Sequence, residues 1–215
     1  MLSERQRAFA RVLDLVEEAG CMPFVALIGS WAEYVYEEAG ILPGSGPNIR
    51  TLDVDFLIRN LRRPVPAAGL AVLARDRGFF VESDRLNGST RILDASGLEV
   101  EFLTRKMGAG AEVSLKTNVG VVAQTLRHLE ILSANLIEVI CLGHLLRVPA
   151  PEAYVIHKMV INNDRGSKAK KDALAIMGLV PYLNEERAVA IFQSLSKKEQ
   201  ARVRSYIAKH DIGHR

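Results

Sequence analysis

The pattern of hydrophobic and polar positions divides the chain into a front part, in which helices alternate with short strands, and a mainly helical back part. Apolar residues recur at helical spacing near the start, and a short apolar run at 24–28 stops abruptly at Gly29-Ser30. Helical spacing returns over 31–40, so the pattern predicts a helix, a strand, a tight turn and a helix. Residues 40–50 are rich in glycine and proline and predict a loop.

A second strand is predicted over 51–58, where apolar residues alternate with Asp53 and Asp55. Two prolines near position 64 then open a predicted helix that continues to 77. Three short β-rich segments with turn signals between them follow and predict a meander: 79–81, 90–93 and 98–103.

The stretch 113–148 fits more than one assignment. Residues 121–126 fit a helix or a strand, whereas three later segments have β-like composition: 129–132, 136–142 and 145–148. From Pro149 onward the pattern is helical, with Ile156, Met159, Val160 and Asn163 on one face and further helices near 168–180, 185–195 and 197–209. We therefore expect an α/β (α+β) fold with a domain at 1–110 and a mixed to mainly helical region at 111–215.

The composition is that of a globular protein, with 48% hydrophobic and 25% charged residues, which excludes a disordered or collagen-like chain. No run approaches the roughly 18 consecutive apolar residues of a membrane span, and the first residues lack the apolar core of a secretory signal. We expect a soluble, cytoplasmic protein with no membrane partner. Cys21 and Cys141 lie in apolar stretches outside any zinc-site spacing and are expected to be buried, reduced thiols.

Charge is unevenly distributed along the chain. The formal net charge is only +3, but residues 147–215 hold 13 Lys and Arg against 7 Asp and Glu, and residues 1–146 hold an excess of acids. A basic back half that faces an acidic front half suits a polyanion such as a nucleoside triphosphate or RNA. A solvated helical face explains the surplus equally well.

Asp53 and Asp55 are the first candidates for chemistry. Residues i and i+2 of a strand project from the same face, so the two carboxylates would lie a few ångströms apart. A cation relieves their repulsion, and Mg²⁺ prefers carboxylate oxygens together with substrate phosphates. The simpler alternative is a strand that carries two acids on its solvated face.

Two further features extend this candidate site. At the strand-to-helix turn, Gly29 lets the backbone approach a ligand closely, Ser30 adds a hydroxyl, and helix N-terminal amides favour phosphate. Ser30 as a plain N-cap is the alternative. Glu99 and Glu101 share one face of the last meander strand, and one of them would complete a cluster of three carboxylates around one or two metal ions, as phosphoryl transfer requires.

The order of these features resembles the nucleotidyltransferase fold of the DNA polymerase β superfamily. The resemblance rests on the apolar strand before Gly29-Ser30, the helix after it, LDVDFL at 52–57 and VEFL at 100–103. GSW at 29–31 and VPAPEAY at 148–154, which leads to His157-Lys158, are similar to bacterial nucleotidyltransferase-like proteins of the Gly-Ser-Trp type, relatives of abortive-infection and minimal nucleotidyltransferases of toxin–antitoxin loci. The resemblance covers roughly residues 20–180 and implies a nucleotidyltransferase-like mixed sheet flanked by helices.

The resemblance also implies roles for individual residues. Gly29 and Ser30 would hold the triphosphate, and Asp53, Asp55 and Glu101 would be the catalytic carboxylates that bind two Mg²⁺ (or Mn²⁺) ions. Glu101 matches the family's hydrophobic–acid–hydrophobic pattern better than Glu99 does. The nucleotide would further be bound by Lys158 and by lysines of a segment similar to the family's Lys-x-x-Lys-Asp pattern: Lys168, Lys170 and Lys171, followed by Asp172. The alternative for all these lysines is a solvated helix face.

Two features depart from the family pattern. Ser30 and Asp53 are 23 positions apart, so the loop at 40–50 is an insertion that acts as a lid or is simply a surface loop. The third acid is Glu101, where Asp is usual. Among other expectations, His157 packs rather than binds a ligand, and Trp31 belongs to the core, with stacking on a base as the alternative.

These observations predict an enzyme that transfers NMP from an NTP to a hydroxyl acceptor with release of pyrophosphate. The acceptor is left open among RNA, a protein and a small molecule. The alternative is a non-catalytic nucleotide- or protein-binding module with a partner protein, for instance in a toxin–antitoxin pair. An RNA-binding protein that uses the basic back half is a third possibility.

Overall fold

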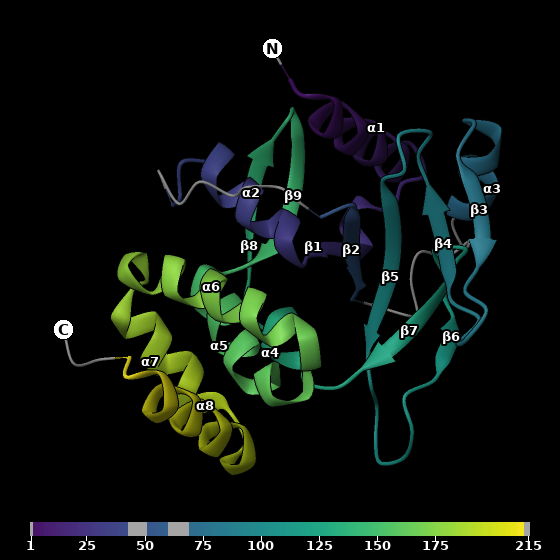
Figure 1. The fold of residues 1–215 in the computed structure, drawn as a ribbon. Helices are drawn as coiled ribbons and strands as arrows, with labels where there is room; N and C mark the ends of the chain where they lie inside the picture. Colours follow the sequence, from purple (N-terminus) through teal and green to yellow (C-terminus); the bar gives the residue numbers. More distant parts are fainter. Residues whose placement is uncertain (1, 43–50, 60–68, 213–215) are drawn as a thin grey trace.

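The computed structural model describes residues 2–42, 51–59 and 69–212. Most of the predicted loop at 40–50 and the predicted start of the helix near 64 lie outside these residues. Figure 1 shows the strands of the main sheet on one side of the molecule and the helices of the C-terminal half on the other.

The main sheet is mixed, as the sequence predicts. Its strands within the described residues are β1 (Val25–Ile28), β2 (Asp53–Ile58), β3 (Phe80–Ser83), β4 (Thr90–Leu93), β5 (Glu99–Arg105), β6 (Ser114–Lys116) and β7 (Val122–Leu126). Five of them follow the order β1-β2-β5-β4-β3, and β6 joins the sheet through β7, which pairs with β5. β5 is parallel to β2 on one side, and on the other side it pairs with β4 along its first half and with β7 along its second. β5 is therefore the central strand, and β2 lies directly beside it.

Helices and a separate hairpin surround this sheet. The helices of the described chain are α1 (Glu4–Glu18), α2 (Ser30–Glu38), α3 (Leu70–Asp76), α4 (Glu130–Ser133), α5 (Pro151–Ile161), α6 (Ala169–Leu179), α7 (Glu185–Ser194) and α8 (Lys197–His210). The antiparallel hairpin of β8 (Leu136–Cys141) and β9 (His144–Pro149) lies against β1. Capping boxes at Ser3 and Ser196 begin α1 and α8, because each hydroxyl accepts from an N–H of the first turn.

Most predicted elements are confirmed, including the antiparallel meander β3-β4-β5, and residues 121–126 form a strand rather than a helix. The β-like assignment of 129–132 is wrong, because this segment enters α4. Leu129 and Leu132, three residues apart, share one small apolar cluster, whereas Ile131 points into the main core, as helical spacing requires.

Asn163 is a second correction. α5 ends at Ile161, so Asn163 falls in the following 3₁₀ turn (Asn162–Asp164) and is exposed instead of sharing the apolar face. The domain division at residue 110 stays a prediction. β6 and β7, which lie beyond it, belong to the same sheet as β5.

The main core lies on one face of the sheet. It buries Trp31, whose ring stacks on Phe9 at 4.2 Å between centroids, which confirms the expected core position and leaves the ring no room for a base. Cys21 and Cys141 are free and buried, and burial raises their thiol pKa values to about 11 and about 12. None of the helices in the described part of the chain combines the length and the apolar character that a membrane span needs.

The other face of the sheet is different. Val54 and Phe56 of β2 point into the main core, so alternation along the strand sends Asp53, Asp55 and Leu57 to the opposite face. Leu57 joins a small apolar cluster there, and the two aspartates continue the same face beyond it. This face opens into the candidate site.

Candidate functional site

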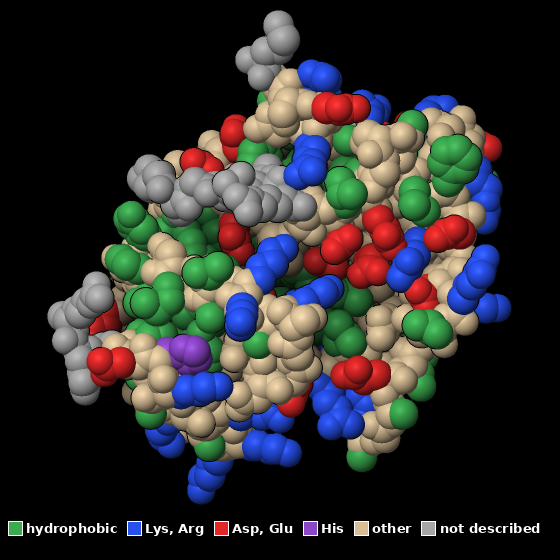
Figure 2. Space-filling view, in the orientation of Figure 1, with side chains coloured by type: hydrophobic (Ala, Val, Ile, Leu, Met, Phe, Trp, Pro, Cys, Tyr) green, Lys and Arg blue, Asp and Glu red, His purple; other side chains and the backbone are tan. Residues whose placement is uncertain are grey.

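A cleft of about 760 Å³ lies between the sheet and the helical half of the molecule. The sheet contributes the carboxylates, and the helical side contributes mostly cations. The charged or titratable residues that line it are Asp53, Asp55, Glu101, Glu112, Arg127, His128, Tyr154, His157, Lys158, Asp164, Arg165, Lys168, Lys198 and Arg202. Figure 2 shows acidic side chains gathered over the sheet with lysine and arginine side chains facing them across a hollow.

The parallel pairing of β2 with β5 brings the predicted carboxylates together. Asp53 is in register with Glu99, and Asp55 with Glu101, so all four carboxylates project from one face of two adjacent strands. Glu101 lines the cleft and Glu99 is not among its lining residues. The structure thus places Glu101, the predicted third acid, beside Asp53 and Asp55.

Asp55 is the carboxylate most affected by its surroundings. Burial raises its pKa to about 7, and the negative charges of Glu101 and Asp53 add to the rise, while Lys168 and Arg165 act in the opposite direction. Like charges held close together oppose ionisation unless a cation compensates them. The cluster therefore has the electrostatic character of a cation site.

Gly29 fixes how closely the turn approaches this cluster. Its backbone has φ of +71°, and a Cβ atom there would lie 2.1 Å from Oδ2 of Asp55, so only glycine fits. Gly29 is also the N-cap of α2, which begins at Ser30, and the N-cap alternative for Ser30 is therefore wrong. Gly29 lines the cleft, whereas Ser30 is half-buried and is not among the lining residues.

The carboxylates fit Mg²⁺ by donor type and by placement, because hard divalent cations prefer carboxylate oxygens and Asp53 and Asp55 project side by side from β2. Among residues 2–42, 51–59 and 69–212, no group of three or more His, Cys, Asp and Glu side chains is positioned to hold a metal ion. Glu101 instead contacts Arg91 of β4, with 3.6 Å between nitrogen and oxygen.

The predicted nucleotide-binding lysines differ in their surroundings. Lys158 lines the cleft but is buried, with 9% of its surface exposed, and its Nζ lies 2.6 Å from Oδ1 of Asp172 and over the ring of Tyr154. A solvated helix face is therefore wrong for Lys158. Lys168 is exposed and lines the cleft, whereas Lys170 and Lys171 are exposed outside its lining.

Asp172 organises this basic side. It is only 2% exposed, and its two oxygens contact Lys158 at 2.6 Å and Nε of Arg165 at 2.8 Å. Burial alone would raise the pKa of Asp172, but these two cations hold it below its ordinary value. The sequence had marked Asp172 only as part of a family pattern, and it had not singled out Arg165.

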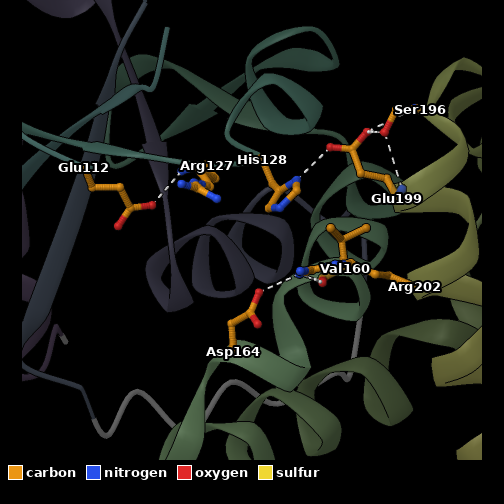
Figure 3. A network of polar contacts seen from close by, with 8 residues as sticks. All are labelled: Glu112, Arg127, His128, Val160, Asp164, Ser196, Glu199 and Arg202. Atoms are coloured by element: carbon orange, nitrogen blue, oxygen red, sulfur yellow. Dashed lines mark hydrogen bonds and ion pairs between the residues drawn. The ribbon is translucent and has the colours of Figure 1, made fainter. Parts of the chain in front are cut away.

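The far wall of the cleft is a polar network that the sequence had not revealed (Figure 3). His128 contacts Glu199 of α8 at 2.7 Å, and Arg202 of the same helix donates to the carbonyl of Val160 at 3.0 Å and to Asp164 at 2.5 Å. His128 has φ of +65°, which is unusual for a non-glycine residue. No local sequence signal identifies such contacts, because they join segments about 40 to 70 positions apart.

His157 lines the cleft and is half-buried. Burial lowers its pKa to about 3, and the neighbouring charges of Lys158, His128 and Arg165 contribute. The imidazole is therefore neutral at physiological pH.

Comparison with known proteins identifies similar solved structures and a matching family model. Among solved structures, the chain is similar to an antigenic nucleotidyltransferase-like protein from Paracoccidioides brasiliensis, with 15% identity, 95% of this chain and 89% of that chain covered, and a TM-score of 0.58. The antibiotic-resistance factor ANT(2'')-Ia matches with 13% identity, coverage of 95% and 98%, and a TM-score of 0.48. No curated protein matches the chain.

The first of these structures supports the fold alone, since its identity is low. A family model described as Nucleotidyltransferase matches residues 7–199, a span that contains the strands of the described sheet, the carboxylates of the cleft and all of its lining cations except Arg202. That match extends over most of the 215 residues, and the chain therefore belongs to this nucleotidyltransferase family.

Proposed function

We propose that the protein is a metal-dependent nucleotidyltransferase that transfers NMP from an NTP to a hydroxyl acceptor and releases pyrophosphate. The observation that carries this proposal is the register of β2 and β5, which sets Asp55 beside Glu101 directly under the Gly29 turn. Acids on the sheet and cations on the helical side then face each other within one cleft. A metal-bound triphosphate needs both kinds of partner.

Each wall of the cleft has a part in this reaction. Asp53, Asp55 and Glu101 would hold Mg²⁺ or Mn²⁺, which supplies positive charge to the triphosphate and to the leaving pyrophosphate. The turn at Gly29 and the first amides of α2 favour phosphate, as helix N-termini do. Lys168, exposed at the cleft, adds a positive charge near Asp55.

The proposed chemistry is a single displacement at phosphorus. The acceptor oxygen forms a bond to the α-phosphorus, and the bond from that phosphorus to the oxygen bridging to the β-phosphate breaks. Pyrophosphate carries away the electron pair, and the acceptor's hydroxyl proton passes to a carboxylate of the acidic cluster. The acceptor is proposed to be RNA, a protein or a small molecule.

Three finer proposals accompany this function. The GSW segment at 29–31 supports membership of the Gly-Ser-Trp subgroup, with a partner protein of the toxin–antitoxin kind. The composition supports a cytoplasmic location. Lys158 and Lys171 complete the proposed set of nucleotide-binding residues. The ammonium group of Lys158 is paired with Asp172, so in this proposal it contacts Asp172 and the nucleotide at the same time.

The test is a thermal-shift titration with each of the four NTPs, with and without Mg²⁺ or Mn²⁺. A ligand at 100 times its dissociation constant that binds only the folded state adds about 2.7 kcal/mol of stability. We expect a metal-dependent shift in the wild type that Asp53→Asn abolishes. Asp76→Asn, the same chemical change at an exposed residue ending α3, serves as the matched control and should leave the shift intact.

Transfer itself is followed with labelled NTP. Label at the α-phosphate should enter an acceptor fraction, whereas label at the γ-phosphate should leave as pyrophosphate. No metal-dependent shift with any nucleotide, together with no incorporation of α-label, would contradict the proposal and favour the binding module.

A further inference from the structure

Arg91 of β4 contacts three acidic side chains beside the cleft. In the register of β4 and β5 it lies directly opposite Glu101. Its guanidinium contacts Oδ2 of Asp84 at 2.6 Å, Oε1 of Glu99 at 2.9 Å and Oε1 of Glu101 at 3.6 Å. It is thus shared between one candidate metal ligand and two acids that do not line the cleft.

The three contacts are unequal. Asp84 is held in place because its Oδ1 accepts from the backbone N–H groups of Leu86 and Asn87 at 2.8 and 3.0 Å, so it anchors Arg91. The contact with Glu101 is the longest of the three and exceeds the 2.7–2.9 Å typical of charge-assisted hydrogen bonds. Glu101 is therefore the acid that Arg91 releases most readily.

The contact with Glu99 also lacks hydrogen-bond alignment. Nε of Arg91 and Oε1 of Glu99 lie 2.9 Å apart, yet both atoms are buried without a hydrogen-bond partner. The guanidinium is therefore held by charge rather than by a well-aligned fork. Such an arrangement can change when the charge around it changes.

We propose that Arg91 is an internal counter-cation of the acidic cluster, which holds Glu101 in the metal-free protein and competes with the divalent ion for its carboxylate. This inference rests on the proposed function, because it assigns Glu101 to the metal. It accounts for the lack of a ready three-acid group in the described residues, since one of the three carboxylates contacts Arg91 instead of turning to the aspartates. Arg91 would thereby set how tightly the metal binds, and it acts as a positioning residue.

The experiment measures Mn²⁺ binding to the full chain without nucleotide, by calorimetry or by the electron paramagnetic resonance of free Mn²⁺. Arg91→Met removes the positive charge and keeps an unbranched side chain, and we expect Mn²⁺ to bind roughly five- to tenfold more tightly because repulsion between two cations a few ångströms apart is lost. Arg91→Lys keeps the charge and should bind Mn²⁺ as the wild type does. Arg105→Met is the matched control, because Arg105 is an arginine of the same sheet paired with Glu130 and outside the cleft lining.

Unchanged or weaker Mn²⁺ binding in Arg91→Met overturns the inference, and so does a gain that persists when Asp55→Asn is added, because the ion then binds elsewhere. Circular dichroism and urea denaturation show whether Arg91→Met folds, and if it does not, Arg91→Gln is measured under the same criteria. Wild-type binding that depends on Asp53 but not on Arg91 removes this inference alone, whereas absence of binding in the wild type and in every variant removes the metal-dependent function as well.

Discussion

Replacing Gly29 by alanine tests whether the turn and the acidic cluster form one unit. Gly29 has φ of +71° and ψ of −161°, a region almost restricted to glycine, and a non-glycine residue held there costs about 1–3 kcal/mol. The added Cβ would also lie 2.1 Å from Oδ2 and 3.1 Å from Cγ of Asp55. That carboxylate therefore has to turn away from its position opposite Glu101. We expect Gly29→Ala to lose stability and metal binding together.

The assay combines urea denaturation with Mn²⁺ titration. Gly20→Ala is the control, because Gly20 also has a positive φ, +66°, but a Cβ there meets no atom within 4 Å. It should cost about 1–2 kcal/mol through backbone strain and leave Mn²⁺ affinity unchanged. If Gly29→Ala loses no more stability than Gly20→Ala and still binds Mn²⁺ like the wild type, the close approach of the turn to Asp55 has no functional meaning and the reasoning fails.

Two further predictions concern the basic side. Asp172→Asn leaves the buried Lys158 ammonium without its counter-charge, and urea denaturation should show a loss of about 3–5 kcal/mol; Glu18→Gln, at an exposed ion pair, should leave the denaturation midpoint unchanged, and equal effects would contradict the argument. Burial lowers the pKa of His157 to about 3, below the ordinary 6.5. As the pH falls, His157 of the unfolded chain therefore binds a proton before His157 of the folded protein does. The stability contributed by the neutral imidazole is full above pH 6.5 and falls from there toward pH 3. This loss of stability amounts to at most about 1.4 kcal/mol per pH unit. In urea denaturation midpoints measured from pH 7 to pH 4, His157→Gln should reduce the dependence of stability on pH. If the variant shows the same pH dependence as the wild type, His157 is not buried as a neutral group.

The elements that could be predicted from the sequence are those whose hydrophobic period is decided locally. The alternation around Asp53 and Asp55 has period two and gives β2 and its acidic face correctly. The segment 129–132 has only three apolar residues among its four, too few to distinguish periods of two and 3.6, so the prediction of a strand there was wrong. Only tertiary packing decides that Leu129 and Leu132 turn to the same side.

Part of the candidate site follows from the sequence in the same way, and part depends on topology. Two acids at i and i+2 identify one wall, but the pairing that brings Glu101 to Asp55 requires β5 to insert between β2 and β4, which no local pattern dictates. The opposite wall of the cleft is even harder to predict from local sequence patterns, because Arg165 and Arg202 come from separate helical segments. Their positions depend on how the helices pack on the sheet.

The residues that sequence reasoning identified and those it missed differ in a physical way. Asp53 and Asp55 break a local rule, since two like charges project side by side from a strand. Burial raises the pKa of Asp55, and repulsion from Glu101 and Asp53 adds to the rise. Such a conflict is visible in the sequence and tends to mark function, because selection retains its cost only where a ligand relieves it. Arg91 breaks no local rule, because a charged residue on a short meander strand is ordinary. Its significance arises only from the carboxylates that the fold assembles around it, those of Asp84, Glu99 and Glu101. The proposed competition between an arginine and a metal ion for one carboxylate can therefore be inferred from the structure but not from the sequence pattern.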